Sequence, residues 1–205
     1  MKGLFISFEG IDGCGKSTQI DLLAKYFTKQ KKNFVKTEEP GGTLGSNEIR
    51  KILLRENNFH WSVETETLLF MAARNDHVEK VIKPAIEDNK IVICDRFMDS
   101  TIVYQGMRSP QAKKFSLMLF EQIGVNPDIT FLIDMDPEVA LNRALTRANN
   151  EDRFENYGIN FQYQLRKNFL DIAHQHSERI KIIDGNRSQE NVAAQIIESI
   201  NNLVL

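Results

Sequence analysis

One stretch of ten residues near the N-terminus constrains this chain more than any other. Residues 9–18 read EGIDGCGKST and fit the pattern G-x-x-x-x-G-K-[ST] of a phosphate-binding loop. Its glycines reach backbone angles that a Cβ disfavours, so consecutive N–H groups can turn inward onto an anion. Lys16 supplies a positive charge for the outer phosphates, and the Ser17 hydroxyl is a possible ligand for Mg²⁺. The pattern therefore predicts phosphate binding.

The flanking residues support this prediction. Residues 4–8 form a short apolar run typical of a buried strand, and residues 20–27 carry apolar side chains at helical spacing. A strand, a glycine loop and a helix in this order direct the helix N-terminus at the phosphate, where free N–H groups and the helix dipole attract an anion. A glycine turn without a ligand is the alternative, and this context argues against it.

Length and composition exclude several classes of protein. The chain has 205 residues, enough for one α/β domain with a full core. Its net charge of −2 gives no sign of a nucleic-acid-binding surface. No apolar run approaches the roughly eighteen residues of a membrane span, and the N-terminal run is too short for a signal peptide. We expect a cytoplasmic protein that binds neither nucleic acid nor membrane.

Strand patterns and helical patterns alternate along the whole chain. The apolar runs typical of strands are residues 4–8, 33–37, 91–95, 128–134 and 180–184. The helical patterns are residues 20–27, 49–54, 62–86, 110–124, 137–147, 160–177 and 189–203, with caps at Asp136 and Ser188 and a stop at Gly124. This alternation predicts one α/β domain over residues 1–205, with a five-stranded parallel sheet between two helical layers.

Polar residues at the carboxyl ends of the strands are candidate site residues, because ligands bind at that edge of a parallel sheet. Asp95 follows the third strand, where an acid can hold Mg²⁺ beside Ser17. Arg96 offers a guanidinium fork for two phosphate oxygens. An Asp–Arg pair without a ligand is the alternative. The other polar residues at strand ends are Glu9, Glu38, Asp134 and Asp184.

Arginines and aromatic residues add further candidates. Arg50, Arg74 and Arg96 come from three segments and suggest a second phosphate-binding pole, whereas Arg143, Arg147 and Arg153 lie on or after the helix before a polar loop. At a mobile lid of about residues 147–158, the latter three would neutralise charge that develops during phosphoryl transfer. Solvated surface charge is the alternative for both groups.

Phe70 and the pair Tyr104-Gln105 suit a flat, hydrogen-bonding base, although Phe70 also fits a core position.

Together these motifs resemble the thymidylate kinase family over essentially the whole chain. The resemblance rests on residues 8–10 (FEG), 39–43 (EPGGT) and 69–74 (LFMAAR), and above all on residues 95–106 (DRFMDSTIVYQG). It implies a P-loop NTPase-type fold, transfer of the γ-phosphoryl group of ATP to dTMP with Mg²⁺, the products dTDP and ADP, and a homodimer.

The resemblance also implies a role for each matching residue. At ATP it places Gly10, Ile11, Asp12, Gly13, Cys14, Gly15, Lys16, Ser17, Thr18 and, near the adenine, Arg143; Ser17 and Asp95 would serve magnesium. At dTMP it places Arg50 and Arg96 on the phosphate, Phe70 on the thymine face, Arg74, Thr101 and Gln105 at the thymine edge, Tyr104 at the sugar 2′ position, and Glu9 or Asp12 near the 3′-hydroxyl. Catalysis would depend on Lys16, Arg96 and a lid arginine, Arg153 first and Arg147 second, because the phosphate loop contains no arginine.

Two points of the sequence leave alternatives open. Glu38 replaces an arginine that the family commonly has before E-P-G-G-T, so it would either weaken dTMP binding or pair elsewhere. Cys14 is either a thiol acidified by Lys16 or a small residue that fits the loop, and Cys94 is expected in the core.

Other functions on the same sequence are less well supported. Another nucleotide or deoxynucleoside kinase would share this scaffold. A GTP-dependent switch protein is disfavoured because residues 89–92 (NKIV) lack the aspartate of the guanine motif N-K-x-D. A non-catalytic module would leave the many phosphate-directed groups without a purpose.

Overall fold

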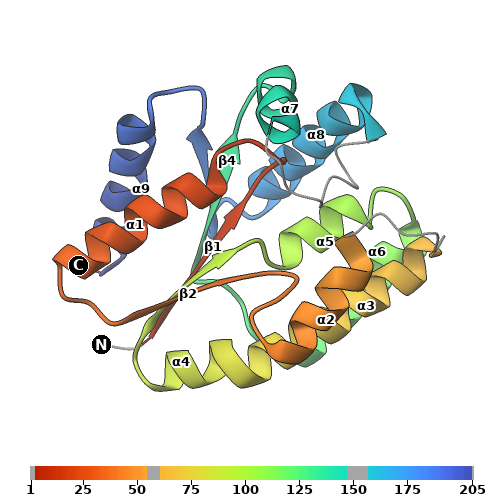
Figure 1. The fold of residues 1–205 in the computed structure, drawn as a ribbon, viewed down its shortest axis with the longest axis horizontal. Coiled ribbons are helices and arrows are strands. Elements are labelled where there is room, and N and C mark those ends of the chain that lie inside the picture. The colour runs from red at the N-terminus through yellow and green to blue at the C-terminus, as the bar shows by residue number, and fades with distance from the viewer. Residues whose placement is uncertain (1–2, 55–60, 147–156, 205) are drawn as a thin grey trace.

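A computed structural model describes residues 3–54, 61–146 and 157–204 (Figure 1). Five strands in the described part form one sheet: β1 (Leu4–Glu9), β2 (Phe34–Glu38), β3 (Ile91–Asp95), β4 (Ile129–Asp134) and β5 (Ile180–Asp184). Their order is β2-β3-β1-β4-β5, and every neighbouring pair is parallel. The predicted five-stranded parallel sheet is confirmed.

Helices connect the strands and cover both faces of the sheet (Figure 1). They are α1 (Lys16–Lys29), α2 (Leu44–Leu54), α3 (Val63–His77), the π-helical segment η1 (Val78–Ile82), α4 (Lys83–Glu87), α5 (Met98–Tyr104), α6 (Pro110–Ile123), α7 (Pro137–Leu145), α8 (Ile159–Gln175) and α9 (Gln189–Val204). Side chains of β1 alternate between two apolar clusters. Phe5 packs with residues of η1 and α6, whereas Ile6 and Phe8 pack with residues of α1 and α9. Burial on both faces explains why the strands are almost wholly apolar.

The predicted helix over residues 62–86 is divided into three parts. Regular α-helix ends at His77, five residues follow in π-helical geometry, and α4 begins at Lys83. Pro84 explains the change, because proline has no N–H and its ring collides with the carbonyl four residues earlier. The wider π turn just before the proline accommodates both effects.

Other expectations differ in detail. The predicted helices did not include α5, so the structure adds a helix that carries the signature residues after Phe97. Glu38 is the last residue of β2 and lies beside Asp95 in the sheet register. The predicted caps are confirmed: Asp136 accepts hydrogen bonds from Glu138 N and Val139 N, and Gly124 ends α6 with a left-handed φ of 68°.

The strand ends meet where the sequence predicts ligands. Phe8 of β1 and Glu38 of β2 both pair with Asp95 of β3, so the carboxyl ends of these three strands lie at one edge. Most of the predicted lid, together with Arg147 and Arg153, lies outside the described residues. In the described part, no helix combines the length and apolar character needed to cross a membrane.

Candidate active site

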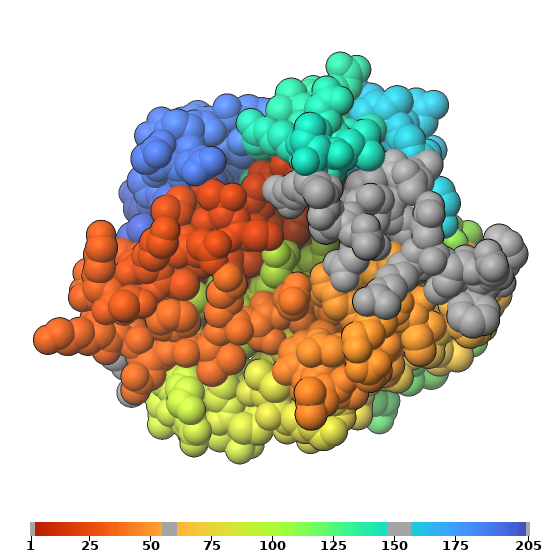
Figure 2. Space-filling view, viewed as in Figure 1, coloured from red at the N-terminus to blue at the C-terminus, as the bar shows by residue number. Residues whose placement is uncertain are grey.

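A cavity of about 280 Å³ opens at the carboxyl ends of the strands. Figure 2 shows this face, where the red N-terminal segment and the orange β2–α2 segment border a hollow with green residues visible inside. Predicted site residues that line the cavity are Asp12, Gly13, Lys16, Ser17, Arg50, Phe70, Arg74, Asp95, Arg96, Thr101, Tyr104 and Gln105. Predicted residues that do not line it are Glu9, Gly10, Ile11, Cys14, Gly15, Thr18 and Arg143. One cavity thus joins the phosphate loop to the residues expected around a base.

The phosphate loop has the backbone that its glycines predict. Gly15 has a φ of 102° and precedes the first residue of α1, so the helix N-terminus faces the loop. A Cβ at Gly13 would lie 1.9 Å from the carbonyl oxygen of Ala140, so α7 packs too closely for any larger residue. Lys16 is 7% exposed, and its Nζ donates to the carbonyl oxygens of Gly10 (3.1 Å) and Ile11 (3.0 Å). A bound phosphate would compete with these carbonyls for the ammonium group.

The residues proposed for magnesium suit a hard cation. Ser17 Oγ donates to Asp95 Oδ2 at 3.0 Å, which brings a hydroxyl and a carboxylate together at the rim of the loop. The second oxygen, Asp95 Oδ1, is buried without a hydrogen-bond partner in the described structure. Mg²⁺ is typically held by one or two protein oxygens, phosphate oxygens and water, so this sparse oxygen set fits it.

Arg96 links the phosphate loop to α5. Its Nη2 donates to Asp12 Oδ1, its Nη1 donates to Gly10 O (3.0 Å) and Ser100 Oγ (2.9 Å), and Tyr104 Oη donates to Asp12 Oδ2 (2.8 Å). Burial raises the pKa of Asp12, but the charges of Arg96 and Lys16 outweigh it and lower that pKa to about 2. Arg96 has a left-handed φ of 64°, a strained conformation for a residue with a side chain. The fold therefore holds this guanidinium in one place.

Glu9 is buried behind the cavity instead of lining it. Its carboxylate accepts from Phe97 N (2.8 Å), Ser100 N (3.2 Å) and Ser100 Oγ (2.6 Å) at the start of α5. Burial, assisted by the Asp99 carboxylate, raises the pKa of Glu9 to about 7 against the opposing effects of Arg96 and these hydrogen bonds. Of the two residues expected near a 3′-hydroxyl, Asp12 lines the cavity and Glu9 supports α5.

The raised pKa of Glu9 predicts a pH-dependent stability. Between the ordinary glutamate pKa of 4.5 and about 7, the folded protein holds a proton that the unfolded chain has lost, so the free energy of unfolding falls as pH rises through this range. The contribution of Glu9 at pH 8 is expected to be about 3 kcal/mol less favourable than at pH 4.5. Urea unfolding of wild type and Glu9→Gln at both pH values measures it. Equal pH dependence of the two proteins would contradict the raised pKa; the exposed Glu87→Gln change is the control.

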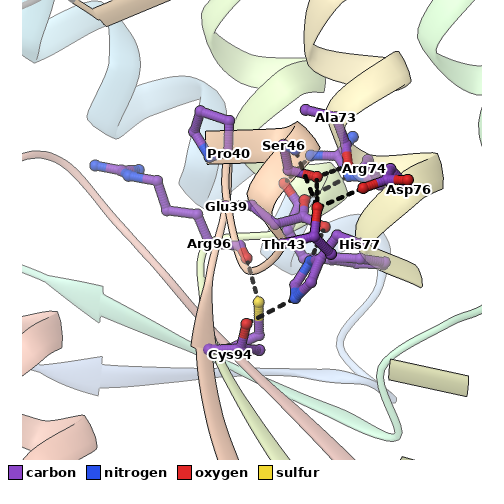
Figure 3. A network of polar contacts seen from close by, with 12 residues as sticks. Glu39, Pro40, Thr43, Ser46, Ala73, Arg74, Asp76, His77, Cys94 and Arg96 are labelled. Atoms are coloured by element: carbon purple, nitrogen blue, oxygen red, sulfur yellow. Dashed lines mark hydrogen bonds and ion pairs between the residues drawn. The ribbon is translucent and has the colours of Figure 1, made fainter. Parts of the chain in front are cut away.

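A buried polar network fixes the loop after β2 to α3 (Figure 3). Arg74 Nε donates to Glu39 Oε2 at 2.6 Å, and Arg74 Nη2 donates to Phe97 O and Thr101 Oγ1, both at 3.0 Å. The other Glu39 oxygen lies 2.9 Å from His77 Nδ1, and His77 Nε2 lies 2.7 Å from Thr37 Oγ1. Sequence reasoning gave no role to Glu39 or His77. The only available signal was that His77 lies three residues after Arg74, on the same side of a helix.

Glu38 pairs with a residue that was predicted to bind phosphate. Its Oε2 lies 3.2 Å from Arg50 Nη1, which also donates to Pro40 O at 2.8 Å. Glu38 therefore pairs with Arg50 at the cavity that it also lines, so it does not turn away from the expected anion site. Because the partner is Arg50, pairing does not exclude weaker binding of an anion.

Gln105 meets a carboxylate that the sequence analysis missed. Gln105 Nε2 donates to Glu66 Oε1 at 2.8 Å, and Arg108 Nη1 donates to the same oxygen at 2.7 Å. Glu66 is wholly buried on α3, where the apolar periodicity drew attention to its neighbours and not to it. Arg143, which was predicted near the adenine, does not line the cavity. Its Nη1 donates to Met135 Sδ at 3.3 Å.

The two cysteines are both buried and free. Burial raises the pKa of the Cys14 thiol, although the charges of Lys16 and Arg96 oppose the change. The structure therefore supports the small, fitting residue and not the acidified thiol. Cys94 packs in the apolar cluster of η1 and α6, as expected.

Comparison with known proteins gives a consistent result. A family model described as thymidylate kinase matches residues 8–196. The thymidylate kinase of Ruegeria pomeroyi is 48% identical over 199 residues, which cover 97% of this chain and 94% of that protein. That of Dinoroseobacter shibae is 50% identical over 200 residues, covering 95% of each. A crystal structure of thymidylate kinase from Ehrlichia chaffeensis has a TM-score of 0.77 and 36% identity, covering 98% of this chain and 99% of its own. The chain therefore belongs to the thymidylate kinase family, a family of nucleoside monophosphate kinases.

Proposed function

We propose that the chain transfers the γ-phosphoryl group of ATP to dTMP, giving dTDP and ADP for DNA precursor synthesis. The observation that carries the proposal is the shared cavity. Lys16 and Ser17 of the phosphate loop line it together with Arg96, Phe70 and Gln105. Two nucleotides can therefore approach end to end with their phosphates between two sets of cations.

On the ATP side, the chain would supply the phosphate loop from Gly10 to Thr18, with Arg143 near the adenine. Backbone N–H groups and Lys16 would hold the outer phosphates, and the reaction needs little from the protein beyond alignment and charge neutralisation. Ser17 and Asp95 would hold Mg²⁺, which neutralises phosphate charge when it is bound.

On the dTMP side, Arg50 and Arg96 would bind the phosphate and Phe70 would stack on the thymine. The remaining base and sugar contacts would come from Arg74, Thr101, Gln105, Tyr104 and Asp12. Hydrogen bonds to Glu39, Phe97 O and Thr101 already fix the Arg74 guanidinium, which limits the entropy lost on binding. For the catalytic arginine we propose Arg153, with Arg147 second; this choice rests on the sequence alone.

The test is a screen of phosphoryl acceptors with purified protein, ATP and Mg²⁺. We expect conversion of dTMP to dTDP to exceed conversion of dUMP, dCMP, AMP and thymidine. A higher kcat/KM for another acceptor would assign a different nucleotide kinase. Tight GTP binding without transfer to any monophosphate would instead favour a switch protein.

The Glu38–Arg50 pair predicts that Glu38→Gln binds dTMP more tightly. The carboxylate occupies a phosphate-binding arginine and repels the incoming anion, but its side chain is 58% exposed, so solvent weakens both effects. We expect the KM for dTMP to fall about two- to fivefold, corresponding to roughly 0.5–1 kcal/mol, with little change in the KM for ATP. Glu48→Gln, which removes an exposed carboxylate from α2, is the matched control. An unchanged or higher KM for dTMP would show that Glu38 does not compete for Arg50.

We also propose that the chain forms a homodimer through α2, α3 and α6. Helix α3 packs against both α2 and α6, and the three helices carry exposed large apolar side chains: Leu44 and Ile52 on α2, Leu68 on α3, and Phe115, Leu117 and Met118 on α6. Such residues are typical of a surface that a second copy covers. Sedimentation equilibrium should give twice the chain mass of 23.6 kDa, and Leu68→Glu or Met118→Glu should give the monomer. A monomeric wild type would refute the proposal.

A further inference from the structure

A buried carboxylate lies next to Gln105, one of the residues that line the cavity. Glu66 lies on α3 with no exposed surface, and its Oε1 accepts hydrogen bonds from Gln105 and Arg108. Gln105 follows the last residue of α5, is 1% exposed and lines the cavity. The Gln105 side chain therefore joins Glu66 to the cavity.

The chemistry of this contact fixes how the Gln105 amide is turned. A carboxylate offers only acceptors, whereas a primary amide has a donor end and an acceptor end of nearly equal size. Glu66 must therefore receive the NH₂ end, and Arg108 supplies the positive charge that pairs with the carboxylate. The acceptor end, Gln105 Oε1, then remains for another partner, and Gln105 is one of the residues that line the cavity.

An acceptor at this position distinguishes two pyrimidines of almost the same shape. Thymine has a donor at N3, between two carbonyl groups, whereas cytosine has an acceptor at N3 beside an amino group. Gln105 Oε1 can accept from the thymine N3–H but would face the lone pair of cytosine. A buried site that leaves polar groups unpaired discriminates strongly against the wrong ligand.

We propose that Glu66 is a positioning residue for base selection: it holds the Gln105 amide so that the cavity prefers thymine to cytosine nucleotides. This inference rests on the proposed transfer to dTMP. If Glu66 becomes glutamine, residue 66 can donate or accept, and the Gln105 amide can turn over at little cost. The cavity then presents either an acceptor or a donor to N3.

The experiment compares dTMP with dCMP in two ways, as kcat/KM ratios and as equilibrium affinities measured by calorimetry. For Glu66→Gln we expect the preference for dTMP to fall at least about tenfold in both measurements, with an unchanged KM for ATP. Glu66→Met, whose thioether has no charge and is only a weak acceptor, should show the same loss. In a Gln105→Leu background, Glu66→Gln should have no further effect on the preference, because the amide that it orients is absent.

A neighbouring carboxylate provides the matched control. Glu64 lies on the same turn of α3 and accepts a hydrogen bond from Ser109 Oγ, so it also joins α3 to the segment after α5, but it does not contact Gln105. Glu64→Gln should keep the preference for dTMP, and thermal unfolding should show that all variants fold. A wild-type preference in folded Glu66→Gln or Glu66→Met would overturn the inference. Absence of turnover by wild type would refute the proposed function, while the affinities would still test Glu66.

Discussion

Lys16→Ala should reduce kcat for phosphoryl transfer by at least about a thousandfold, which corresponds to roughly 4 kcal/mol of transition-state stabilisation. Lys16 is 7% exposed, and two backbone carbonyls of the phosphate loop hold its ammonium group where the outer phosphates would bind. Lys16 is the only lysine among the described residues that line the cavity, so none of these can replace it in neutralising charge on the transferred phosphoryl group. The measurement is steady-state turnover with saturating ATP, dTMP and Mg²⁺.

The fold should tolerate this change. The Lys16 side chain belongs to neither apolar cluster of the core, and the Gly10 carbonyl that it leaves still accepts a hydrogen bond from Arg96 Nη1 (3.0 Å). Lys25→Ala, at an exposed position of α1, controls for loss of a lysine from the same helix. Turnover of Lys16→Ala within tenfold of wild type, with the same melting temperature, would remove Lys16 from the catalytic machinery.

Arg96→Met should lower kcat/KM for dTMP by about a thousandfold. Arg96 reaches the phosphate loop, α5 and the cavity at once, so its removal takes away a phosphate-binding charge and the partner that keeps Asp12 ionised. Loss of one charge-assisted contact to a developing phosphate charge typically costs two to three orders of magnitude, roughly 3–4 kcal/mol. Steady-state kinetics with dTMP varied at saturating ATP measures the effect.

The dependence of kcat/KM on pH, together with a control variant, separates a direct role of Arg96 from a structural one. Without Arg96, the pKa of Asp12 should rise from about 2, because burial then outweighs the remaining charge of Lys16. Arg166→Met is the control, since it breaks an arginine–aspartate pair with Asp134 (2.6 Å) away from the lining of the cavity. If Arg96→Met and Arg166→Met lowered kcat/KM equally, the effect of Arg96 would be one of stability alone.

Local patterns in the sequence determined the architecture and the chemistry of the phosphate end. The loop at residues 9–18 specifies its own backbone through glycine, and the strands are apolar runs because both faces of the sheet are covered. The residues predicted at strand ends converge because parallel strands end at one edge. These features depend on neighbours in the chain or on periodicity, so they can be read without coordinates.

Only the tertiary structure decided how distant side chains pair. Glu38 with Arg50, Glu39 with Arg74 and His77, and Glu66 with Gln105 join segments 12 to 39 residues apart. No local signal marks such pairs, because a buried carboxylate on an apolar helix resembles a solvated one until its partner is placed. The sequence thus predicted a phosphate-binding loop and determined where the strands end, whereas packing between α3, α5 and the loop after β2 determined how the charged side chains around the cavity pair.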